Sequence, residues 1–324
     1  MFYLVILIGS FLLTYLIRLA ALKKKVIDVP NERSSHTVST PRGGGLAIVI
    51  TIYSGWSYLY FENLIEKNLF YALLFGLPVS LTGILDDIIG LNYKYRLIIH
   101  SISAGGALWF TGGLSKVDTG IFTLENPVLL TGCAFIGILW FINLFNFLDG
   151  IDGYAATEAV FIAAALFGFI SDQSVLIIAF SAMGFLVWNW QSAKIFMGDV
   201  GSTSIGFTFA VYAIWYQNNE KLSLITSAIL TALFWFDATI TLYRRLRNRE
   251  ILTSAHKKHA FQRLVQAGFS HQKTVWLSFL VNLFLLGLAM LSFIFNLFSP
   301  VLLGVSLIIL YTIVKMIDRK KSFA

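Results

Sequence analysis

Acidic side chains stand at the ends of three apolar segments of this chain, where carboxylates are unusual. Asp86 and Asp87 close one segment, Asp149 and Asp152 follow a second, and Asp199 precedes a third. Adjacent carboxylates repel, so one of the first two needs a raised pKa unless a cation lies between them. Mg²⁺ prefers such oxygen ligands, together with substrate phosphates. The pattern favours a metal-assisted site for a phosphate-bearing substrate; a solvated helix end is the alternative for the pair alone.

The segment Asn143–Gly153 is the most informative one. Asn143, Asn146 and Asp149 recur at three-residue spacing, so on a helix they share one face. A glycine after each aspartate lets the backbone turn or approach a ligand closely. Polar groups in a Phe- and Leu-rich stretch are costly near lipid unless they line a cavity. The segment therefore predicts part of a binding site, rather than only a satisfied polar helix end.

Phe196–Thr203 places another carboxylate directly before a predicted helix. Ser202 or Thr203 could cap that helix, whose free N–H groups also form an anion site. Asp199 beside them would be the ligand that brings a metal to a phosphate. Simple helix capping is the alternative that the sequence leaves open.

Pro41–Gly45 forms a glycine-rich lead into another predicted helix. The segment lacks the Lys-Ser/Thr pair of a P-loop, which excludes that nucleotide motif. We expect Arg42 to face phosphate or lipid, with bare backbone packed close behind it. A flexible connection is the plainer alternative. Arg33 and His36 lie just ahead, on the same side of the membrane.

The stretch that begins at His256 combines His, Lys and Arg side chains, all of which suit phosphate oxygens. His256 and His259 could bind zinc, but no third ligand has a suitable spacing. We expect the stretch to contact a diphosphate or nucleotide, and a basic amphipathic loop on the membrane surface is the alternative. Asp237 either assists this stretch or pairs with Arg244 or Arg245.

The elements that must position these residues are apolar helices. The chain has 324 residues, of which 57% are hydrophobic and 13% charged, whereas soluble domains average about 25% charged residues. Runs of apolar residues therefore predict an all-α transmembrane bundle of about eleven helices, in one domain covering residues 1–324. The sixth and seventh runs could instead form one re-entrant pair. The runs are 3–22, 44–61, 69–85, 95–112, 128–145, 154–170, 174–190, 202–218, 221–243, 273–296 and 298–316.

Basic residues indicate the orientation, since Lys and Arg near span ends favour the cytoplasm. The even-numbered connections contain only Lys67, Lys116 and Lys221. The N-terminus should therefore lie outside and the C-terminus inside, with all five aspartates at the cytoplasmic face. The net charge of +7 is explained by this topology and by attraction of the basic residues to anionic lipid head groups. No nucleic-acid partner is therefore expected. The basic residues of the odd-numbered connections and the tail are Lys23, Lys24, Lys25, Arg33, Arg42, Lys94, Arg96, Lys194, Arg244, Arg245, Arg247, Arg249, Lys257, Lys258, Arg263, Arg319, Lys320 and Lys321.

Taken in order, these motifs resemble the polyprenyl-phosphate N-acetylhexosamine-1-phosphate transferase family, the membrane type of glycosyltransferase family 4. The resemblance implies transfer of an N-acetylhexosamine-1-phosphate from a UDP-sugar to polyprenyl (undecaprenyl) phosphate, with release of UMP. It also implies a requirement for Mg²⁺, which Mn²⁺ could replace. The segments that carry the resemblance are Pro41–Gly45, Asp86-Asp87 with Lys94, Asn143–Gly153, Phe196–Ser202 and His256–Leu264.

The resemblance also implies residue roles, a location and a pathway. The enzyme would lie in the bacterial inner membrane with a cytoplasmic active site, and a homodimer is left open. The His256-x-x-His259 pattern is closest to the O-antigen-initiating branch and argues against a muramyl-pentapeptide substrate. The sugar itself stays open. By motif match, the catalytic residues are Asp86, Asp87, Asp149 and Asp152, the metal ligands Asp199 and Asp87, and the substrate-binding residues Arg42, Lys94, Asn143, Asn146, His256 and His259.

Two other classes of membrane protein also carry charged motifs among apolar spans. A cation-coupled transporter should place its ionisable residues near the bilayer midplane on broken helices, whereas the aspartates here stand at span ends. A CDP-alcohol phosphotransferase also uses Asp-Gly motifs, but Asp149–Gly153 lacks the downstream aspartates in that family's spacing. Both alternatives are therefore less favoured than the transferase.

Overall fold

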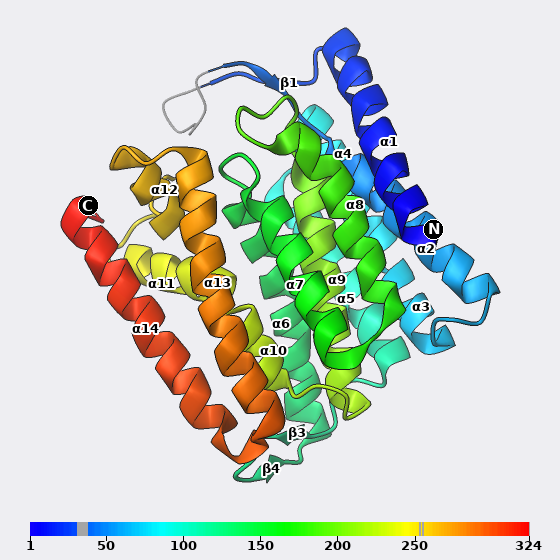
Figure 1. The fold of residues 1–324 in the computed structure, drawn as a ribbon, viewed down its shortest axis with the longest axis vertical. Helices are drawn as coiled ribbons and strands as arrows, with labels where there is room; N and C mark the ends of the chain where they lie inside the picture. Colours follow the sequence, from blue (N-terminus) through cyan, green and yellow to red (C-terminus); the bar gives the residue numbers. More distant parts are fainter. Residues whose placement is uncertain (31–37, 253, 255, 324) are drawn as a thin grey trace.

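The computed structural model describes residues 1–30, 38–252, 254 and 256–323, so Arg33 and His36 lie outside the described residues. Helices dominate this part of the chain, with two short antiparallel hairpins, β1–β2 and β3–β4 (Figure 1). The elements are α1 (Phe2–Lys24), β1 (Ile27–Asp28), β2 (Thr40–Pro41), α2 (Gly45–Phe61), α3 (Lys67–Leu74), α4 (Gly76–Ile89), α5 (Tyr93–Thr111), β3 (Val117–Asp118), β4 (Thr123–Leu124), α6 (Pro127–Leu148), α7 (Tyr154–Ile170), α8 (Gln173–Asn189), α9 (Asp199–Asn218), α10 (Leu224–Leu230), α11 (Ala232–Arg247), α12 (Ala260–Gln266), α13 (His271–Ile294), the 3₁₀ turn η1 (Asn296–Phe298) and α14 (Ser299–Lys320).

Several of these helices can cross a membrane. Among the described residues, five helical stretches are long and apolar enough, or six if the bent pair α10 and α11 forms one span. The α2, α7 and α8 helices are apolar but shorter. The chain is therefore an all-α, multi-pass membrane protein. The five stretches are Phe2–Lys24, Lys67–Ile89, Pro127–Leu148, His271–Ile294 and Asn296–Lys320.

The sixth and seventh predicted runs are separate helices, α7 and α8. Each has 17 residues, which is about 25 Å of helix. Two other runs are interrupted. The run 69–85 divides at Phe75 into α3 and α4, and the run 221–243 bends by 79° between α10 and α11. The indole N–H of Trp235 donates to the Ala228 carbonyl at 2.8 Å, which satisfies a carbonyl group beside the bend.

The α9 helix lies at the centre of the bundle, in contact with α2, α4, α5 and α6. A Cβ atom on Gly45 would collide with the backbone of Gly201, and one on Gly83 would collide with the backbone of Val200. Small residues allow helices in membranes to approach this closely. As a result, the N-terminus of α9 lies beside the end of α4 and the start of α2.

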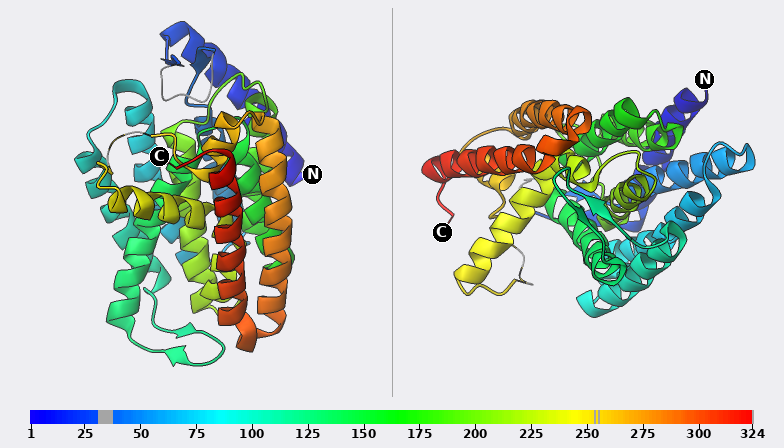
Figure 2. Two further views of the ribbon diagram at one scale, coloured as in Figure 1. Left: turned by 90° about the vertical axis from the view of Figure 1, so that its left-hand side faces the viewer. Right: turned by 90° about the horizontal axis from the view of Figure 1, so that it is seen from below.

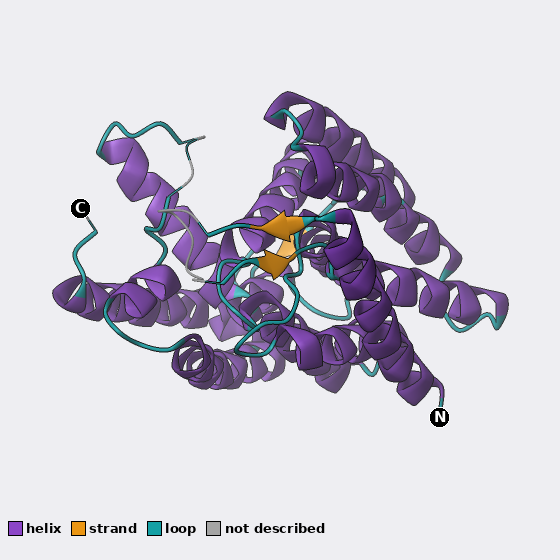
Figure 3. Ribbon diagram, turned by 90° about the horizontal axis from the view of Figure 1, so that it is seen from above, coloured by secondary structure: helices purple, strands orange, loops and turns teal. Residues whose placement is uncertain are grey.

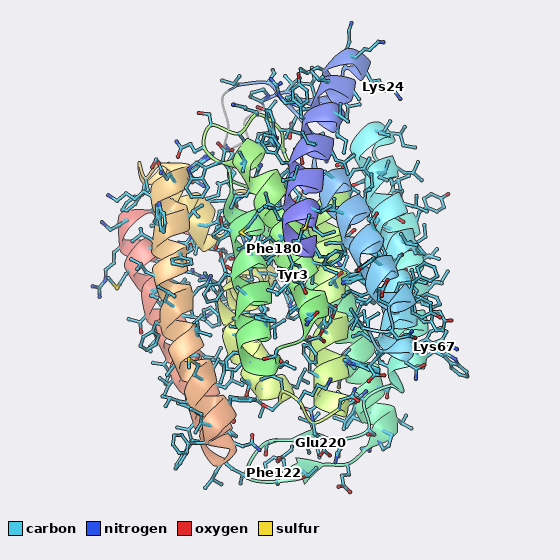
Figure 4. All side chains as sticks on the ribbon, turned by 45° about the vertical axis from the view of Figure 1, so that its right-hand side comes forward. Tyr3, Lys24, Lys67, Phe122, Phe180 and Glu220 are labelled. Atoms are coloured by element: carbon cyan, nitrogen blue, oxygen red, sulfur yellow. The ribbon has the colours of Figure 1, made fainter. Side chains whose placement is uncertain are left out.

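The bundle has two distinct ends. The β1–β2 hairpin and α12 lie at one end, called here the β1 end, and β3 and β4 lie at the other, the β3–β4 end (Figure 1). Seen from above, the β1–β2 hairpin covers the middle of the bundle (Figure 3). The α11 helix runs almost across the other helices (Figure 2). Lys24 lies at the β1 end, whereas Phe122 and Glu220 lie at the opposite end (Figure 4).

Candidate active site

Asp87 at the end of α4 binds the N-terminus of α9. Its Oδ1 accepts a hydrogen bond from the Asp199 N–H at 3.0 Å, and its Oδ2 accepts one from the Val200 N–H at 3.3 Å. Gly198 precedes the helix with a φ of 75°, and a Cβ atom there would collide with the Asp87 carboxylate. Helix N-termini favour anions. Here the anion is the protein's own carboxylate.

The expectation that Ser202 or Thr203 caps α9 is wrong. Both hydroxyls donate back along the helix, Ser202 to the Gly198 carbonyl at 3.1 Å and Thr203 to the Asp199 carbonyl at 2.6 Å. They lie inside the first turn rather than ahead of it, where a capping side chain would reach the free N–H groups. Ser202 instead accepts a hydrogen bond from Asn146 Nδ2 at 3.3 Å, which joins α6 to the start of α9.

Two arginines bridge three carboxylates at this point. Arg42 Nη2 lies 2.5 Å from Asp87 Oδ1 and 3.5 Å from Asp199 Oδ1. Arg96 Nη1 lies 2.7 Å from Asp86 Oδ2 and 3.0 Å from Asp199 Oδ2. Asp199 is therefore shared by both guanidinium groups. We call these five residues the carboxylate–arginine cluster. When all five are ionised, its carboxylates exceed its guanidinium groups by one.

Of the two cations at the start of α5, Arg96 rather than Lys94 lies in this cluster. Lys94 is exposed near the start of the helix, where its backbone N–H donates to Asn92 Oδ1 at 3.0 Å. Arg96, two residues later, reaches the carboxylates instead. A signal for Arg96 was available, because it is the one Lys, Arg, Asp or Glu in the predicted run 95–112. A charge within such a run requires a partner.

The donor atoms of the cluster suit a hard cation. Among the described residues, no three His, Cys, Asp or Glu side chains are arranged to hold a metal ion. Mg²⁺, however, usually binds through one or two carboxylates and completes its shell with water and substrate phosphates. The oxygen-only donors Asp87 and Asp199 fit that mode. A cation there would compete with Arg42 for the same oxygens.

Asp149 directly follows α6. Burial, together with the neighbouring carboxylates of Asp199 and Asp87, raises the pKa of Asp149 to about 8. With no cation nearby, its carboxyl group is therefore mostly neutral at pH 7. A cation close to it would favour the ionised form. The protonation of Asp149 is thus sensitive to what binds at the cluster.

Asp152 is held within the scaffold. Its Oδ2 accepts a hydrogen bond from the Ala193 N–H at 3.1 Å and lies 3.3 Å from His271 Nδ1. The next residue, Gly153, donates its N–H to Asn189 Oδ1 at 3.0 Å. These contacts tie the connection after α6 to the connection after α8 and to the start of α13. Asp152 makes no ion pair with the two arginines of the cluster among the described contacts.

The two asparagines of α6 make different contacts. Asn143 Nδ2 donates to the Leu139 carbonyl of its own helix at 2.7 Å, whereas Asn146 reaches Ser202 on α9. Asn146 is thus tied directly to the start of α9, and Asn143 lies one turn further from it.

The glycine-rich segment behind Arg42 pairs with the segment before α9. Gly44 N–H donates to the Phe196 carbonyl at 2.9 Å, and Gly45 N–H donates to the Met197 carbonyl at 2.8 Å. The Phe196 N–H donates in turn to the Pro41 carbonyl at 2.8 Å. The expected close packing of bare backbone behind Arg42 is confirmed.

His256 and His259 lie together just before α12, with ring centroids 4.9 Å apart. Burial, together with the neighbouring His259 and Arg245, lowers the pKa of His256 to about 4. His256 is therefore neutral at pH 7 and can offer a hydrogen bond but no charge. His259 is buried and packs its ring on Phe261, with centroids 5.8 Å apart.

Asp237 on α11 assists this segment. Its Oδ1 and Oδ2 lie 2.9 and 3.0 Å from the N–H of Ala260, the first residue of α12, and Oδ1 lies 3.8 Å from His259 Nδ1. The alternative pairing with Arg244 or Arg245 is wrong, because both arginines bind other carboxylates. Asp237 therefore fixes the point at which α12 begins, directly after His259.

An apolar pocket of about 330 Å³, open on one side, lies between α6, α7, α9, α10 and α11. Its lining extends from Val117 in β3 to Trp235 beside the bend. A largely apolar pocket of this size suits a hydrocarbon chain.

The fold and these sites define a class of protein, an all-α membrane protein with a charged cluster at one end and an apolar pocket between its helices. Comparison with known proteins agrees with this class. Residues 69–217 match glycosyl transferase family 4. This range contains the paired aspartates, the Asn143–Gly153 segment and Asp199.

Three relatives extend the match over most of the chain. A Bacillus subtilis (strain 168) protein, described as a probable undecaprenyl-phosphate N-acetylglucosaminyl 1-phosphate transferase, is 30% identical over 86% of this chain and 81% of its own. An undecaprenyl-phosphate alpha-N-acetylglucosaminyl 1-phosphate transferase of Thermotoga maritima is 28% identical over 79% of both chains. A decaprenyl-phosphate N-acetylglucosaminephosphotransferase of Mycobacterium leprae is 26% identical over 84% of this chain and 78% of its own. The chain therefore belongs to the polyprenyl-phosphate N-acetylhexosamine-1-phosphate transferase family.

Proposed function

We propose that the protein transfers an N-acetylhexosamine-1-phosphate from a UDP-sugar to polyprenyl phosphate and releases UMP. The observation that carries the proposal is the carboxylate–arginine cluster at the β1 end. Phosphoryl transfer depends mostly on positioning and on neutralising phosphate charge, and both kinds of charged group are present there. The names of the relatives make UDP-N-acetylglucosamine the first donor to test.

The roles within the cluster follow from the contacts of each side chain. Asp199 and Asp87 would hold Mg²⁺, or Mn²⁺ in its place, which when bound neutralises phosphate charge. Arg42 and Arg96 would then leave the carboxylates and bind phosphate oxygens, for which guanidinium groups are well suited. Asp86 would orient the acceptor phosphate. The cluster thus exchanges internal ion pairs for contacts with substrate.

Other residues would shape the donor site around this cluster. Asp149 would stand at the nucleotide and metal region, with Asp152 positioning its loop. Asn146 would orient the donor beside α9, while His256 and His259 would offer hydrogen bonds to the diphosphate. Asn143 and the exposed Lys94 would contribute at the margins of the donor site, further from the reacting phosphorus.

The acceptor side is supported by the apolar pocket and by the membrane itself. A polyprenyl chain must be removed from water, and either the lipid bilayer or the apolar pocket between α6 and α10 would provide an apolar environment for it. A charged cluster at the end of membrane helices can receive the phosphate head while the tail stays among apolar side chains. This arrangement supports a transferase over a cation-coupled transporter, whose charges should lie near the bilayer midplane.

We further propose a topology of eleven spans in a single domain, with the N-terminus outside and the β1 end in the cytoplasm of a bacterial inner membrane. The Lys and Arg imbalance supports this orientation. Cysteine labelling tests it in a Cys133→Ser background, since Cys133 is exposed. Glu220→Cys should be labelled on intact cells and Asn248→Cys only after permeabilisation. The opposite result would reverse the orientation.

The product would begin a cell-surface polysaccharide of the O-antigen kind, as the His256-x-x-His259 pattern suggests. The test uses purified protein with Mg²⁺, polyprenyl phosphate and a panel of UDP-N-acetylhexosamines. We expect UMP and a lipid diphosphate sugar with at least one donor. Release of UDP instead would mean that the sugar moves without its phosphate, and the proposal would fail.

A further inference from the structure

Phe323, the last described residue, lies against cations from three different elements. The guanidinium carbon of Arg244 on α11 is 4.1 Å from the centre of its ring, and that of Arg263 on α12 is 5.5 Å away. Lys258, in the segment that carries the two histidines, places its Nζ 5.4 Å from the same centre. The ring is only 8% exposed. A cation over an aromatic face is attracted to it, more strongly where water is excluded.

Asp318 on α14 holds two of the same cations. Its two oxygens accept hydrogen bonds from Arg244 at 3.0 and 2.8 Å, and Oδ1 also accepts one from Arg263 Nη1. The Arg263 side chain is buried, and Nη1 also donates to the Lys321 carbonyl at 3.2 Å. Paired charge-assisted bonds of this kind are strong, and a buried guanidinium left without its partner would be costly.

Apolar contacts join the same two helices. Val314 and Ile317 of α14 are buried against Ala260 of α12, with Ile313 and Leu264 packed around them. The end of α14 therefore holds α12 through an apolar cluster, a shared carboxylate and an aromatic ring. The α12 helix is packed into the protein rather than lying free on the membrane surface.

The opposite side of α12 faces the candidate active site. The rings of Phe261 and Tyr154 stack with centroids 4.8 Å apart, and a Cβ atom on Gly150 would lie 3.1 Å from the Phe261 ring. Gly150 directly follows Asp149. The α12 helix thus lies between the end of α14 and the loop that carries the Asp-Gly motifs, and contacts both.

We propose that Asp318–Phe323, the C-terminal clasp, positions the His256–Leu264 segment against the donor diphosphate. The proposal rests on the proposed function, in which that segment contacts the donor. Phe323 is then a positioning residue, because it acts through Lys258 and Arg263 and touches no reacting group. Loosening the clasp should weaken donor binding in the ground state and the transition state alike, which raises KM more than it lowers kcat.

The test compares variants of the full-length enzyme. Phe323→Ala should raise the KM for the UDP-sugar about tenfold, since three weak cation–π contacts are lost together, and Asp318→Asn should raise it further. The KM for polyprenyl phosphate should not change. Phe323→Trp should retain the wild-type KM, because an indole ring also attracts cations. The matched control is Tyr311→Ala, which removes an exposed ring of α14 that binds only Lys315 among the described cations.

Hydrogen exchange without substrate separates the clasp from the proposed function. In Phe323→Ala, amides of α12 should exchange faster than in the wild type, while amides of α9 should not. If the wild type released no UMP but this difference appeared, the proposed function would fail and the role of the clasp in holding α12 would stand. Unchanged KM and unchanged exchange would overturn the clasp. An equal fall in kcat with every substrate and no change in KM would also overturn it, because that pattern indicates a general structural role.

Discussion

The two ends of the bundle both carry ion pairs, but they are built differently. At the β3–β4 end, Lys116 pairs with Glu220 through side chains that are 46% and 70% exposed. At the β1 end, the Asp87 side chain is 3% exposed, and Asp199 is shared by two guanidinium groups. Exposed pairs contribute little to stability, whereas buried charges must overcome a desolvation cost. Convergence and burial, rather than the number of charges, distinguish the candidate site.

This contrast also shows why the β1 end can bind substrate. Its carboxylates already have partners, but the two arginines among these partners are side chains that can turn toward a phosphate. A cation could therefore replace the arginines at the carboxylates, and the arginines could then bind the oxygens of a diphosphate. Among the described residues, no second ion pair joins the Lys116–Glu220 pair at the other end, and both side chains are exposed. We therefore expect substitutions there to have little consequence.

The largest expected effect is at the shared carboxylate. Asp199→Asn keeps the shape of the side chain but removes a charged oxygen, and activity should fall by about 10² to 10⁴, with partial rescue at high Mg²⁺. Glu220→Gln, the matched change at the far end, should leave activity unchanged. Calorimetry of metal-dependent UDP-sugar binding checks the cause. If the Asp199→Asn variant bound donor and Mg²⁺ with wild-type affinity, another residue would have to be the metal ligand.

The next largest effect is expected at Arg96, and Lys94 on the same helix provides the comparison. Arg96→Gln should lower kcat/KM by roughly 10- to 100-fold, because a guanidinium group that reaches Asp86 and Asp199 is lost from the place where phosphate charge develops. Lys94→Gln should raise the donor KM only a few-fold, as expected of an exposed side chain. Steady-state kinetics on both variants provide the measurement. Equal losses would show that the contacts of Arg96 have no special role.

A pH profile tests the environment of Asp149. Its pKa is raised to about 8, so the ionised form becomes available as the pH rises. If that form is required, kcat/KM should increase with pH through an inflection near 8 and level off above it. More Mg²⁺ should move the inflection to lower pH, because a cation favours the carboxylate. The residual activity of Asp149→Asn should lack this limb. Persistence of the limb in the variant would assign it to another group.

The smallest expected effect is on stability at the far end. Lys116→Gln should leave the thermal unfolding temperature of the purified protein within experimental error, because its ion pair with Glu220 is exposed and screened. Asp87→Asn should lower that temperature measurably, since Asp87 binds both Arg42 and the N-terminus of α9. A larger shift for Lys116→Gln than for Asp87→Asn would remove the distinction between the two ends.

Much of the fold could be predicted from hydropathy alone, because each apolar run is long enough to form a helix. The bend between α10 and α11 could not, since a carbonyl group beside it is satisfied by a side chain, that of Trp235, rather than by the helix itself. Hydropathy did not show the division at Phe75, because the run stays apolar on both sides of it, although Gly76 and Pro78 just after it are residues that interrupt helices. Hydropathy reports where a helix can lie and carries little information about where it breaks.

The candidate site was partly predictable for similar reasons. Aspartates beside glycines and asparagines stand out in an apolar sequence, so Asp87 and Asp199 could be identified. The pairing of both with Arg42 could not, because Arg42 comes from a distant part of the chain. Arg96 lies ten residues after Asp86, and its charge within an apolar run was a usable signal. The side chains of Ser202 and Thr203 were misjudged because their exact position relative to the first turn decides whether they cap the helix. Tertiary contacts determined each of these outcomes.

One measurement tests the central claim most directly. The UDP-sugar is labelled in the phosphate next to the sugar, and the purified enzyme is given Mg²⁺ and polyprenyl phosphate. Transfer of a sugar-1-phosphate predicts that the label moves into the lipid product while unlabelled UMP is released, and that Asp199→Asn strongly lowers both. Label that stays with the nucleotide as UDP would contradict the account.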